Sequence, residues 1–466
     1  MPIFVYNSLT RKKEEFIPLK PPKVNIYTCG VTVYDESHIG HARSLYIFDV
    51  IRRYLKYRRF KVRFVRNITD IDDKIINRAR ELKIDWKELV KKYIARYYQD
   101  LKILGIQKGD FEPRATANIR EMIKHILGLM KKGYAYVTDS GVYFNVRKFK
   151  DYGKLSGQGI DQMQSGARIE PDENKTDPLD FALWKKSKPD EPSWNSPWGR
   201  GRPGWHIECS AMSQKFLKTE TLDMHAGGRD LIFPHHENEI AQAEALTGKV
   251  FARYWIHHGL LTINGQKMAK SLGNFVTIKD FMEKYKNADL LKMFFLSAHY
   301  AHPMDYTDEK IEEAKKALER ILILMDKAEK MAARRKPRLG SREFKEIEQI
   351  KAKFIEVMDD DFNTPEALAV IFELVNTANK NIEDLNFILC AKNTLKELLD
   401  ILGVALKIEE KTSAVTDEEI QTMILEREEA RRQKNYKLAD KIRKKLESSG
   451  IILEDETGST HWRRKL

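Results

Sequence analysis

The sequence predicts an α/β fold, because apolar strands alternate with amphipathic helices over the first two thirds of the chain. Residues 24–28 read as an apolar strand, residues 45–55 carry apolar side chains at helical spacing, and residues 62–68 supply a second strand. This βαβ order is typical of a parallel sheet covered by helices. From about residue 280 onward the patterns are almost entirely helical. We therefore expect a parallel-sheet domain followed by a helical region.

Length and composition limit the class of protein. The 466 residues can form roughly two to four domains. The 82 basic against 69 acidic side chains give a net charge of +13, which permits a polyanionic partner such as nucleic acid. No segment approaches the roughly 20 apolar residues that span a bilayer. The N-terminus lacks the layout of a secretion signal, and three widely spaced cysteines argue against a disulfide framework, so we expect a cytoplasmic protein without membrane contacts.

The crossover from the first strand into the first helix holds two histidines. Ser37 is a good N-cap residue and would place His38 and His41 in the first helical turn, where free N–H groups and the helix dipole attract phosphate. Gly40 allows a ligand to approach the backbone closely. A His-x-x-His pair alone is more often structural than functional. Its position in a βαβ unit favours a nucleotide site.

Two signatures in the expected order strengthen this interpretation. His38-Ile39-Gly40-His41 resembles the nucleotide-binding signature of class I aminoacyl-tRNA synthetases, and the stretch from Lys267 to Ser271, Lys-Met-Ala-Lys-Ser, resembles the second signature of that class. A basic loop by itself is most often a solvated turn. Because the loop from Lys267 to Ser271 follows the first signature by roughly two hundred residues, we treat it as a candidate phosphate site.

Several local patterns define the remaining elements. Asp70, Asp72 and Asp73 could bind Mg²⁺, but we favour helix capping. Residues 134–146 alternate like a hairpin, and residues 187–204 have the composition of a loop.

Further along the chain, Gly227, Gly228 and Asp230 have the composition of a loop against a ribose, and Pro234 suits the first residue of a helix. Residues 255–262 read as a strand, Asn264-Gly265 marks a tight turn, and residues 427–445 read as one basic helix followed by a short hairpin.

Four side chains form a candidate metal site. His235 and Glu239 are four residues apart, so on a helix they project from one face. Together with Cys29 and Cys209 they offer thiolate, imidazole and carboxylate ligands, a set that suits Zn²⁺ better than Mg²⁺ or Ca²⁺. Cysteines so far apart are more often small buried side chains. The neighbouring histidines 206 and 236 are competing ligand candidates.

The chain resembles the cysteinyl-tRNA synthetases over nearly its whole length. The resemblance lies in the Cys29-Gly30 lead into the first signature, the block Gly-Trp-His-Ile-Glu-Cys-Ser-Ala-Met from Gly204, the block Phe-Pro-His-His-Glu-Asn-Glu from Phe233, and the lysine loop. It implies a Rossmann-type catalytic domain in two parts with a stem region, an inserted connective domain, an α-helical bundle and a small C-terminal α/β anticodon-binding domain. The boundaries it implies are 1–114 and 205–310 (stem near 260–310), 115–204, 311–406 and 407–466.

The resemblance also implies one Zn²⁺ per chain, held by residues matching Cys29, Cys209, His235 and Glu239, with an open position for the substrate thiol. Shape alone separates serine from cysteine by only a few kcal/mol at best. A soft metal ion can take the thiol as thiolate and leaves the hydroxyl a poor competitor. Thr69 and Trp205 match residues that line this amino-acid pocket.

The implied reaction is the ATP-dependent attachment of L-cysteine to tRNA(Cys) through cysteinyl-adenylate, with ATP used as its Mg²⁺ complex. By the resemblance, the phosphates are held by His38, His41 and Gly40, and the nucleoside by Gly227 and Asp230. Pyrophosphate is neutralised by Lys267 and Lys270, of which Lys270 is our first choice.

Two departures from the family pattern could alter the rate of the reaction. Ala269 replaces the usual serine of the second signature, and Val31 stands where the family often has proline. Neither removes a candidate catalytic residue.

The C-terminal region resembles an anticodon-binding part, and we expect a monomer. Residues suited to phosphate or base contacts are Arg431, Arg432, Lys434, Lys437, Lys441, Arg443 and Trp462, although each could simply belong to the wet face of a helix. One rival function is the joining of cysteine to an amino sugar, which the long basic region after Ala301 disfavours. A non-catalytic RNA-binding relative is disfavoured by the intact signatures.

Overall fold

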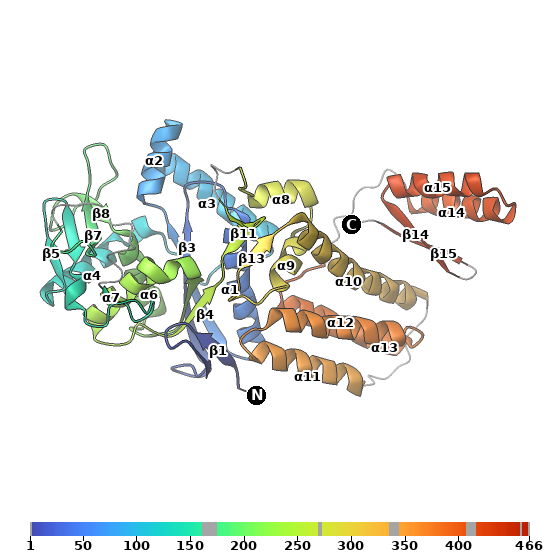
Figure 1. Cartoon of the computed structure of the whole chain (residues 1–466), viewed down its shortest axis with the longest axis horizontal. Coiled ribbons are helices and arrows are strands. Elements are labelled where there is room, and N and C mark those ends of the chain that lie inside the picture. Colours follow the sequence, from blue (N-terminus) through green and yellow to red (C-terminus); the bar gives the residue numbers. More distant parts are fainter. Residues whose placement is uncertain are drawn as a thin grey trace. The chain divides into compact units, whose positions relative to one another are not determined.

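A computed structural model of the protein describes residues 2–160, 175–268, 273–334, 344–406, 416–456 and 459–464 (Figure 1). The chain divides into two compact units, residues 1–405 and 406–466. Each unit is described by itself below.

A parallel four-stranded sheet forms the centre of the first unit. Its strands lie in the order β10 (Ala252–His258), β9 (Leu222–Gly228), β3 (Lys23–Thr32) and β4 (Lys61–Thr69), and each neighbouring pair is parallel. Most side chains of β9 and β10 are buried, as expected for strands covered on both faces. The sheet and its helices confirm the predicted α/β class.

Helices connect and cover these strands. The crossover from β3 to β4 is α1 (Ile39–Tyr57), and the other helices of this part are α2 (Asp73–Leu82), α3 (Trp86–Ile103), α6 (Trp205–Leu217) and α7 (Glu237–Thr247). Asp72 is the N-cap residue of α2, because its carboxylate accepts from the Lys74 N–H at 2.9 Å, which confirms the capping interpretation for this residue. Asp70 does not cap α2, because its carboxylate accepts from the Thr116 N–H at 2.8 Å. Before α7, Phe233 has extended backbone, so helical dihedral angles begin at Pro234, as predicted.

A second, antiparallel sheet interrupts the sheet domain. After α4 (Ile119–Lys131), the strands β5 (Ala135–Val137), β6 (Gly141–Phe144), β7 (Phe181–Lys186) and β8 (Gly201–Pro203) pair in that order. The β5–β6 hairpin was predicted. The interpretation of residues 187–204 as loop throughout was wrong for β8, because this three-residue strand is too short to leave a periodic pattern and forms by pairing with β7.

A hairpin and a small three-stranded sheet complete the N-terminal part. The hairpin β1 (Phe4–Asn7) with β2 (Lys12–Glu15) is antiparallel. The predicted strand at residues 255–262 is in fact interrupted at Gly259, after which β11 (Leu261–Ile263) joins a separate sheet in the order β12 (Gln266–Lys267), β11, β13 (Met304–Tyr306). Asn264 and Gly265 both have positive φ in the β11–β12 turn, as that dipeptide predicted.

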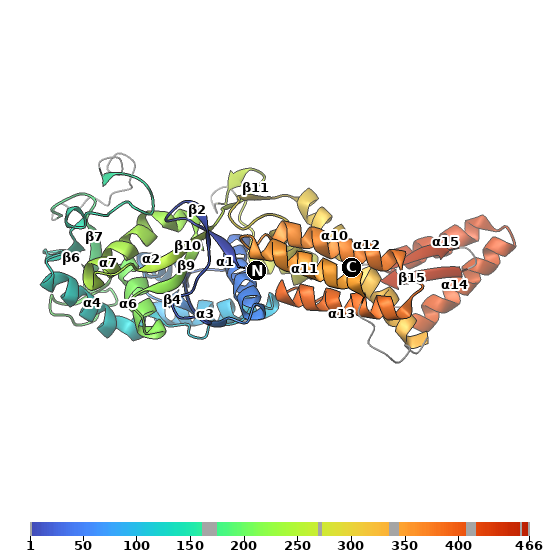
Figure 2. The same cartoon turned by 90° about the horizontal axis from the view of Figure 1, so that it is seen from below.

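The helical part of the first unit follows. The helices α10 to α13 lie side by side in both views (Figures 1 and 2). Asn363 caps α12 ahead of Pro365. The helices of this part are α8 (Ile278–Tyr285), α9 (Ala288–Leu296), α10 (Asp308–Arg334), α11 (Lys345–Asp359), α12 (Thr364–Lys380) and α13 (Leu385–Ile401).

The second unit is a helix pair on a hairpin: α14 (Asp417–Arg432), α15 (Tyr436–Ser448), β14 (Ile451–Glu456) and β15 (Ser459–Arg464). The single helix predicted over 427–445 is wrong, because Lys434 has a positive φ and Asn435 caps a new helix. None of the helices within the described ranges is both long and apolar enough to cross a membrane.

Candidate functional site

The start of α1 fixes the ring protons of two histidines. His38 Nδ1 accepts from the N–H groups of Gly40 (3.1 Å) and His41 (3.3 Å), and His41 Nδ1 accepts from the N–H of His38 (3.3 Å). These reciprocal bonds form a capping box. Because each Nδ1 accepts, each neutral ring carries its proton on Nε2, which is therefore an N–H donor. The predicted N-cap Ser37 was wrong, since its carbonyl instead accepts from the N–H of Ile278 (2.9 Å).

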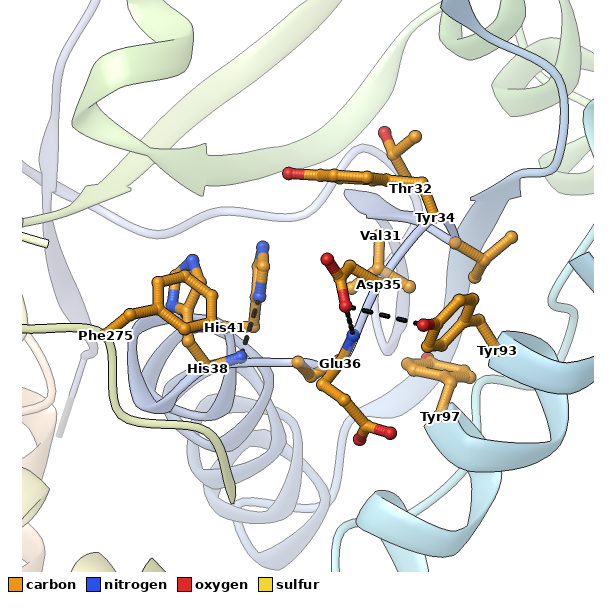
Figure 3. Close-up of a pocket in the computed structure, with 12 residues that line it drawn as sticks. Val31, Thr32, Tyr34, Asp35, Glu36, His38, His41, Tyr93, Tyr97 and Phe275 are labelled. Carbon is orange, nitrogen blue, oxygen red and sulfur yellow. Dashed lines mark hydrogen bonds between the residues drawn. The ribbon is translucent and has the colours of Figure 1, made fainter. Parts of the chain in front are cut away.

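A pocket opens beside these histidines (Figure 3). Its walls are the loop from β3 to α1, Tyr93 and Tyr97 of α3, and Phe275. The rings of His38 and His41 stack at a centroid distance of 3.7 Å. Burial, together with the nearby His38 and Lys74, lowers the pKa of His41 to about 3, so its ring is neutral at physiological pH. Nε2–H donors at a helix N-terminus suit phosphate oxygens.

The other nucleotide candidates lie on the carboxyl side of the sheet. Gly227 is at the end of β9, and Asp230 is exposed in the short turn that follows. A Cβ on Gly227 would lie only 2.7 Å from the His236 ring, so glycine permits this close approach. In parallel sheets this edge is where ligands bind.

The second signature begins next to the first. Lys267 ends β12 and is exposed, and a Cβ on Gly40 would lie 3.3 Å from Cε of Met268. The described end of the lysine loop therefore reaches the first turn of α1. Lys270 and Ala269 lie outside the described residues.

Four predicted metal ligands meet at one buried point. Donor atoms of Cys29, Cys209, His235 and Glu239 all lie within 4.8 Å of one another. The two Sγ atoms are 3.7 Å apart, and Cys209 Sγ is 3.6 Å from His235 Nε2. Glu239 Oε1 lies 3.3 Å from Cys29 Sγ and 2.9 Å from His235 Nε2. A tetrahedral zinc ion with bonds of about 2.0–2.3 Å separates its ligands by about 3.3–3.8 Å. Three of these four distances lie in that range, and the His235–Glu239 distance is shorter because these two side chains form an ion pair, so the donor set suits zinc.

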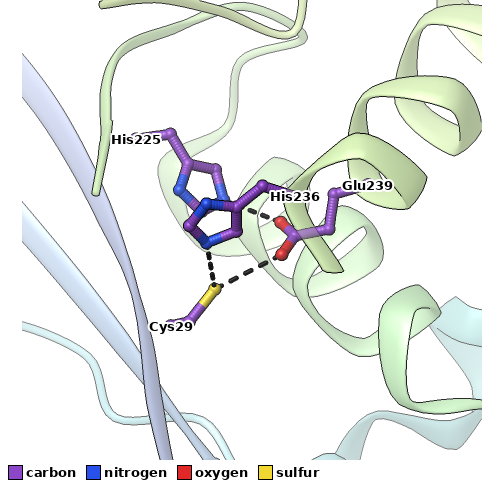
Figure 4. A group of neighbouring side chains, drawn as sticks. All are labelled: Cys29, His225, His236 and Glu239. Atoms are coloured by element: carbon purple, nitrogen blue, oxygen red, sulfur yellow. Dashed lines mark hydrogen bonds and ion pairs between the residues drawn. The ribbon is translucent and has the colours of Figure 1, made fainter. Parts of the chain in front are cut away.

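A second set of donors overlaps the first (Figure 4). Cys29 and Glu239 also lie beside His225 and His236, again with all donor atoms within 4.8 Å. His236 Nε2 is 3.2 Å from Cys29 Sγ, and its Nδ1 is 2.8 Å from Nε2 of His257. The competing candidate His236 is thus beside the cluster.

The other competing histidine, His206, lies outside both donor sets. It contacts the cluster through His235, since their Nδ1 atoms are 2.9 Å apart.

Burial and the neighbouring charges shift the pKa values of the side chains in this cluster. Burial raises the pKa of the Cys29 thiol, and Cys209 and Glu239 raise it further. Burial also acts to raise the pKa of Cys209, but hydrogen bonds with Cys29 and His235 outweigh it and lower that pKa. Against burial, His225 and His235 hold the pKa of Glu239 well below its usual range. A carboxylate that stays ionised in a buried site is suited to binding a cation.

The predicted amino-acid pocket residues adjoin this cluster. The Trp205 ring stacks on His235 at a centroid distance of 4.0 Å and is 37% exposed. Thr69 Oγ1 is buried and donates to Glu208 Oε2 at 2.7 Å. Burial raises the pKa of Glu208 well above its ordinary value, although the bond from Thr69 opposes this shift.

Sequence reasoning missed two of the residues in this site. His225 lies within β9, where a period-two pattern gives no sign of a ligand, and only its pairing with Glu239 reveals it. Glu208 stands directly before Cys209, so its position in that block was a usable signal.

Comparison with family models covers most of the chain. Residues 15–316 match the model of the tRNA synthetases class I (C) catalytic domain, residues 353–407 the DALR domain, and residues 415–463 the cysteinyl-tRNA ligase anticodon binding domain.

Similar proteins agree with these matches. The chain is 50% identical to a cysteine–tRNA ligase of Thermodesulfovibrio yellowstonii, with 99% of each chain covered, and 48% identical to that of Aquifex aeolicus, covering 100% of this chain and 99% of the relative.

Solved structures share the fold at low identity. Mycobacterium tuberculosis methionyl-tRNA synthetase with methionyl-adenylate aligns with a TM-score of 0.62 at 16% identity, covering 82% of this chain and 90% of the other. A LeuRS–tRNA–LeuAMS ternary complex of Agrobacterium radiobacter aligns at 0.64 and 11% identity, covering 84% and 85%.

Proposed function

The chain belongs to the cysteine–tRNA ligase family, and on this premise we propose which of its residues select cysteine and which activate it. The family reaction is the ATP-dependent attachment of L-cysteine to tRNA(Cys) through cysteinyl-adenylate. The protein must therefore recognise a thiol and stabilise charge at the α-phosphate. The Cys/His/Glu cluster suits the first task, and the start of α1 suits the second.

The residues proposed to hold one zinc ion are Cys29, Cys209, His235 and Glu239. The observation that carries this proposal is their convergence, from separate parts of the sequence, on one buried point with donor spacings that fit zinc. When bound, the ion would supply a soft Lewis acid that takes the substrate thiol as thiolate and leaves serine a poor competitor.

The neighbouring side chains are proposed to orient the amino acid. Trp205, stacked on His235, offers a partly exposed apolar wall next to the donor set. Thr69 and Glu208 form a buried polar pair, and Glu208 directly precedes Cys209 in the sequence. We propose that this pair binds a polar group of the amino acid while the thiol of the same molecule reaches the cluster.

The nucleotide is proposed to bind between the two signatures. Because both Nδ1 atoms accept from N–H groups of the helix start, the Nε2–H groups of His38 and His41 are the donors that we assign to phosphate oxygens. Gly227 and Asp230 would hold the nucleoside, and Lys267 with Lys270 would neutralise pyrophosphate as it leaves. Catalysis would then rest on positioning and on electrostatic stabilisation rather than on a covalent enzyme intermediate. ATP is proposed to enter as its Mg²⁺ complex.

The second unit is proposed to bind the anticodon of tRNA. Its predicted contact residues are exposed along the α14–α15 pair, whereas Trp462 packs against the core of the unit. The exposed basic residues are Arg431, Arg432, Lys434, Lys437, Lys441 and Arg443.

The cellular setting and the domain boundaries complete the proposal. The three cysteines are free thiols, which fits a reducing cytoplasm. A monomer, absence of membrane contact, and the boundaries near residues 115, 205, 311 and 407 stay predictions.

Cysteine-dependent exchange of pyrophosphate into ATP tests the activation step, and transfer of cysteine to tRNA with a GCA anticodon tests the second step. We expect both activities. A protein that performs exchange but charges no tRNA would instead be an enzyme that uses a small acceptor, and one without exchange would contradict the assignment.

A further inference from the structure

Arg43 is a fully buried cation whose hydrogen-bond acceptors are main-chain carbonyls. Its Nη1 donates to the carbonyls of Gly259 (2.8 Å) and Leu260 (3.0 Å), and its Nη2 to those of Tyr300 (3.2 Å) and His302 (2.6 Å). Burial lowers the pKa of Arg43 to about 10, so the group stays charged at neutral pH. Burying a charge is costly unless its bonds are well made. The planar guanidinium provides four directed bonds that an ammonium cannot reproduce.

These four carbonyls belong to two chain segments that cross. Gly259 donates its N–H to the Tyr300 carbonyl (2.9 Å), and Met304 donates to Leu260 (2.9 Å). A Cβ on Gly259 would lie 2.2 Å from the His302 carbonyl oxygen, so the segments touch. Arg43 therefore closes a junction between the end of β10 and the start of β13.

The small sheet that carries Lys267 begins at this junction. β11 begins directly after Leu260 and pairs in parallel with β13, with Leu261 opposite Met304. On its other edge β11 pairs with β12, where Thr262 is opposite Lys267. A shift at the junction would consequently move Lys267.

The chain that follows the lysine loop is also attached to α1. Ile39 donates its N–H to the Val276 carbonyl (3.0 Å), Ile278 donates to Ser37 (2.9 Å), and Phe275 lies edge-on to the His38 ring. Arg43 is two residues after His41 on the same helix. The first two turns of α1 thus contact the segments on both sides of Lys267.

We propose that Arg43 is a positioning residue for adenylate formation: its four bonds set the placement of Lys267 relative to His38 and His41. The inference rests on the proposed function, since it assigns a task to Arg43 within that reaction. Arg43 itself contacts no substrate in this account, and acts through the sheet β12-β11-β13.

Arg43→Lys tests the proposal, with Arg52→Lys as the matched control. Arg52 is on the same helix, is 4% exposed, and binds the Lys108 carbonyl and Asp110, away from the lysine loop. We expect Arg43→Lys to lower kcat of pyrophosphate exchange about 100-fold, with the KM for cysteine and the zinc content unchanged. Arg52→Lys should lose comparable thermal stability but keep kcat. Equal kcat in the two variants would overturn the proposal.

A second variant keeps the test valid if Arg43→Lys does not fold. Asp305 is partly exposed in β13 of the same sheet, opposite Thr262, and its carboxylate accepts from Thr262 Oγ1 (2.6 Å) and the Gly265 N–H (2.8 Å). Asp305→Ala should lower kcat about 10-fold, again without a change in the KM for cysteine. An unchanged kcat would overturn the proposal. Wild-type protein without exchange activity would contradict the proposed function instead.

Discussion

Nε2 of His225 lies 2.7 Å from Oε2 of Glu239, and neither side chain is exposed to solvent. The other oxygen of Glu239 faces Cys29 and His235. His225 thus holds the carboxylate in the orientation that a metal ligand needs, as residues behind metal ligands commonly do. His225 also belongs to the overlapping donor set, so its substitution distinguishes the two sets.

We expect His225→Gln to weaken zinc binding about 10- to 100-fold while leaving one ion per chain at saturating zinc, because the orienting bond is lost but the four donors remain. A titration against a competing chelator measures this. Complete loss of zinc in His225→Gln, with full zinc retained in Cys209→Ser, would instead place the ion in the set that contains His225 and His236.

Lys267→Ala should lower kcat of cysteine-dependent exchange about 100-fold, because positive charge opposite the departing pyrophosphate is removed. Zinc content should not change, since Lys267 is exposed on β12 and belongs to neither donor set. Lys279→Ala is the control, as this lysine on α8 is exposed and pairs only loosely with Glu283 at 3.8 Å. Similar rates for both variants would remove Lys267 from the phosphate site.

Replacing Lys434, Lys437 and Lys441 together by alanine should lower kcat/KM for tRNA charging about 10-fold or more and weaken its salt dependence, because phosphate contacts are lost. Exchange without tRNA serves as the internal control and should be unaffected. If the rate of tRNA charging is unchanged, these lysines only form the solvated face of a helix and do not contact tRNA.

His125 predicts an acid-dependent loss of stability. Burial lowers its pKa to about 4, although its bond to the Gln242 carbonyl opposes the shift. The pKa of this side chain in the unfolded chain is about 6.5. As the pH falls below 6.5, His125 binds a proton in the unfolded chain but stays neutral in the folded protein, so the free energy of unfolding decreases until about pH 4. Between pH 7 and pH 5 this protonation lowers the free energy of unfolding by about 2 kcal/mol.

His125→Gln keeps a donor for the Gln242 carbonyl but does not titrate. Its unfolding transition should therefore shift less between pH 7 and pH 5 than that of the wild type. Identical pH dependence would show that His125 is not held neutral by the fold.

Features encoded within a few residues were predictable from the sequence. Asp72 caps a helix, and Asn264-Gly265 turns a hairpin, because their short-range chemistry leaves little choice of conformation. The i, i+4 spacing of His235 and Glu239 likewise places both beside one point.

Features that depend on distant partners were not predictable. Ser37 is chemically a good N-cap, but pairing with Ile278 takes its carbonyl and leaves the cap to His38. Gly259 interrupts a strand because another segment crosses there, with the His302 carbonyl against its Cα. The meeting of Cys29 with Cys209 was expected from family resemblance, since 180 residues separate them.

The most direct test of the account measures zinc per chain together with exchange driven by cysteine or serine, in wild type, Cys209→Ser and Cys390→Ser. Cys390 lies on α13 and serves as the control. The account predicts one zinc and strong preference for cysteine in wild type and in Cys390→Ser, and joint loss of zinc and cysteine activation in Cys209→Ser. One zinc per chain with undiminished cysteine activation in Cys209→Ser would contradict it.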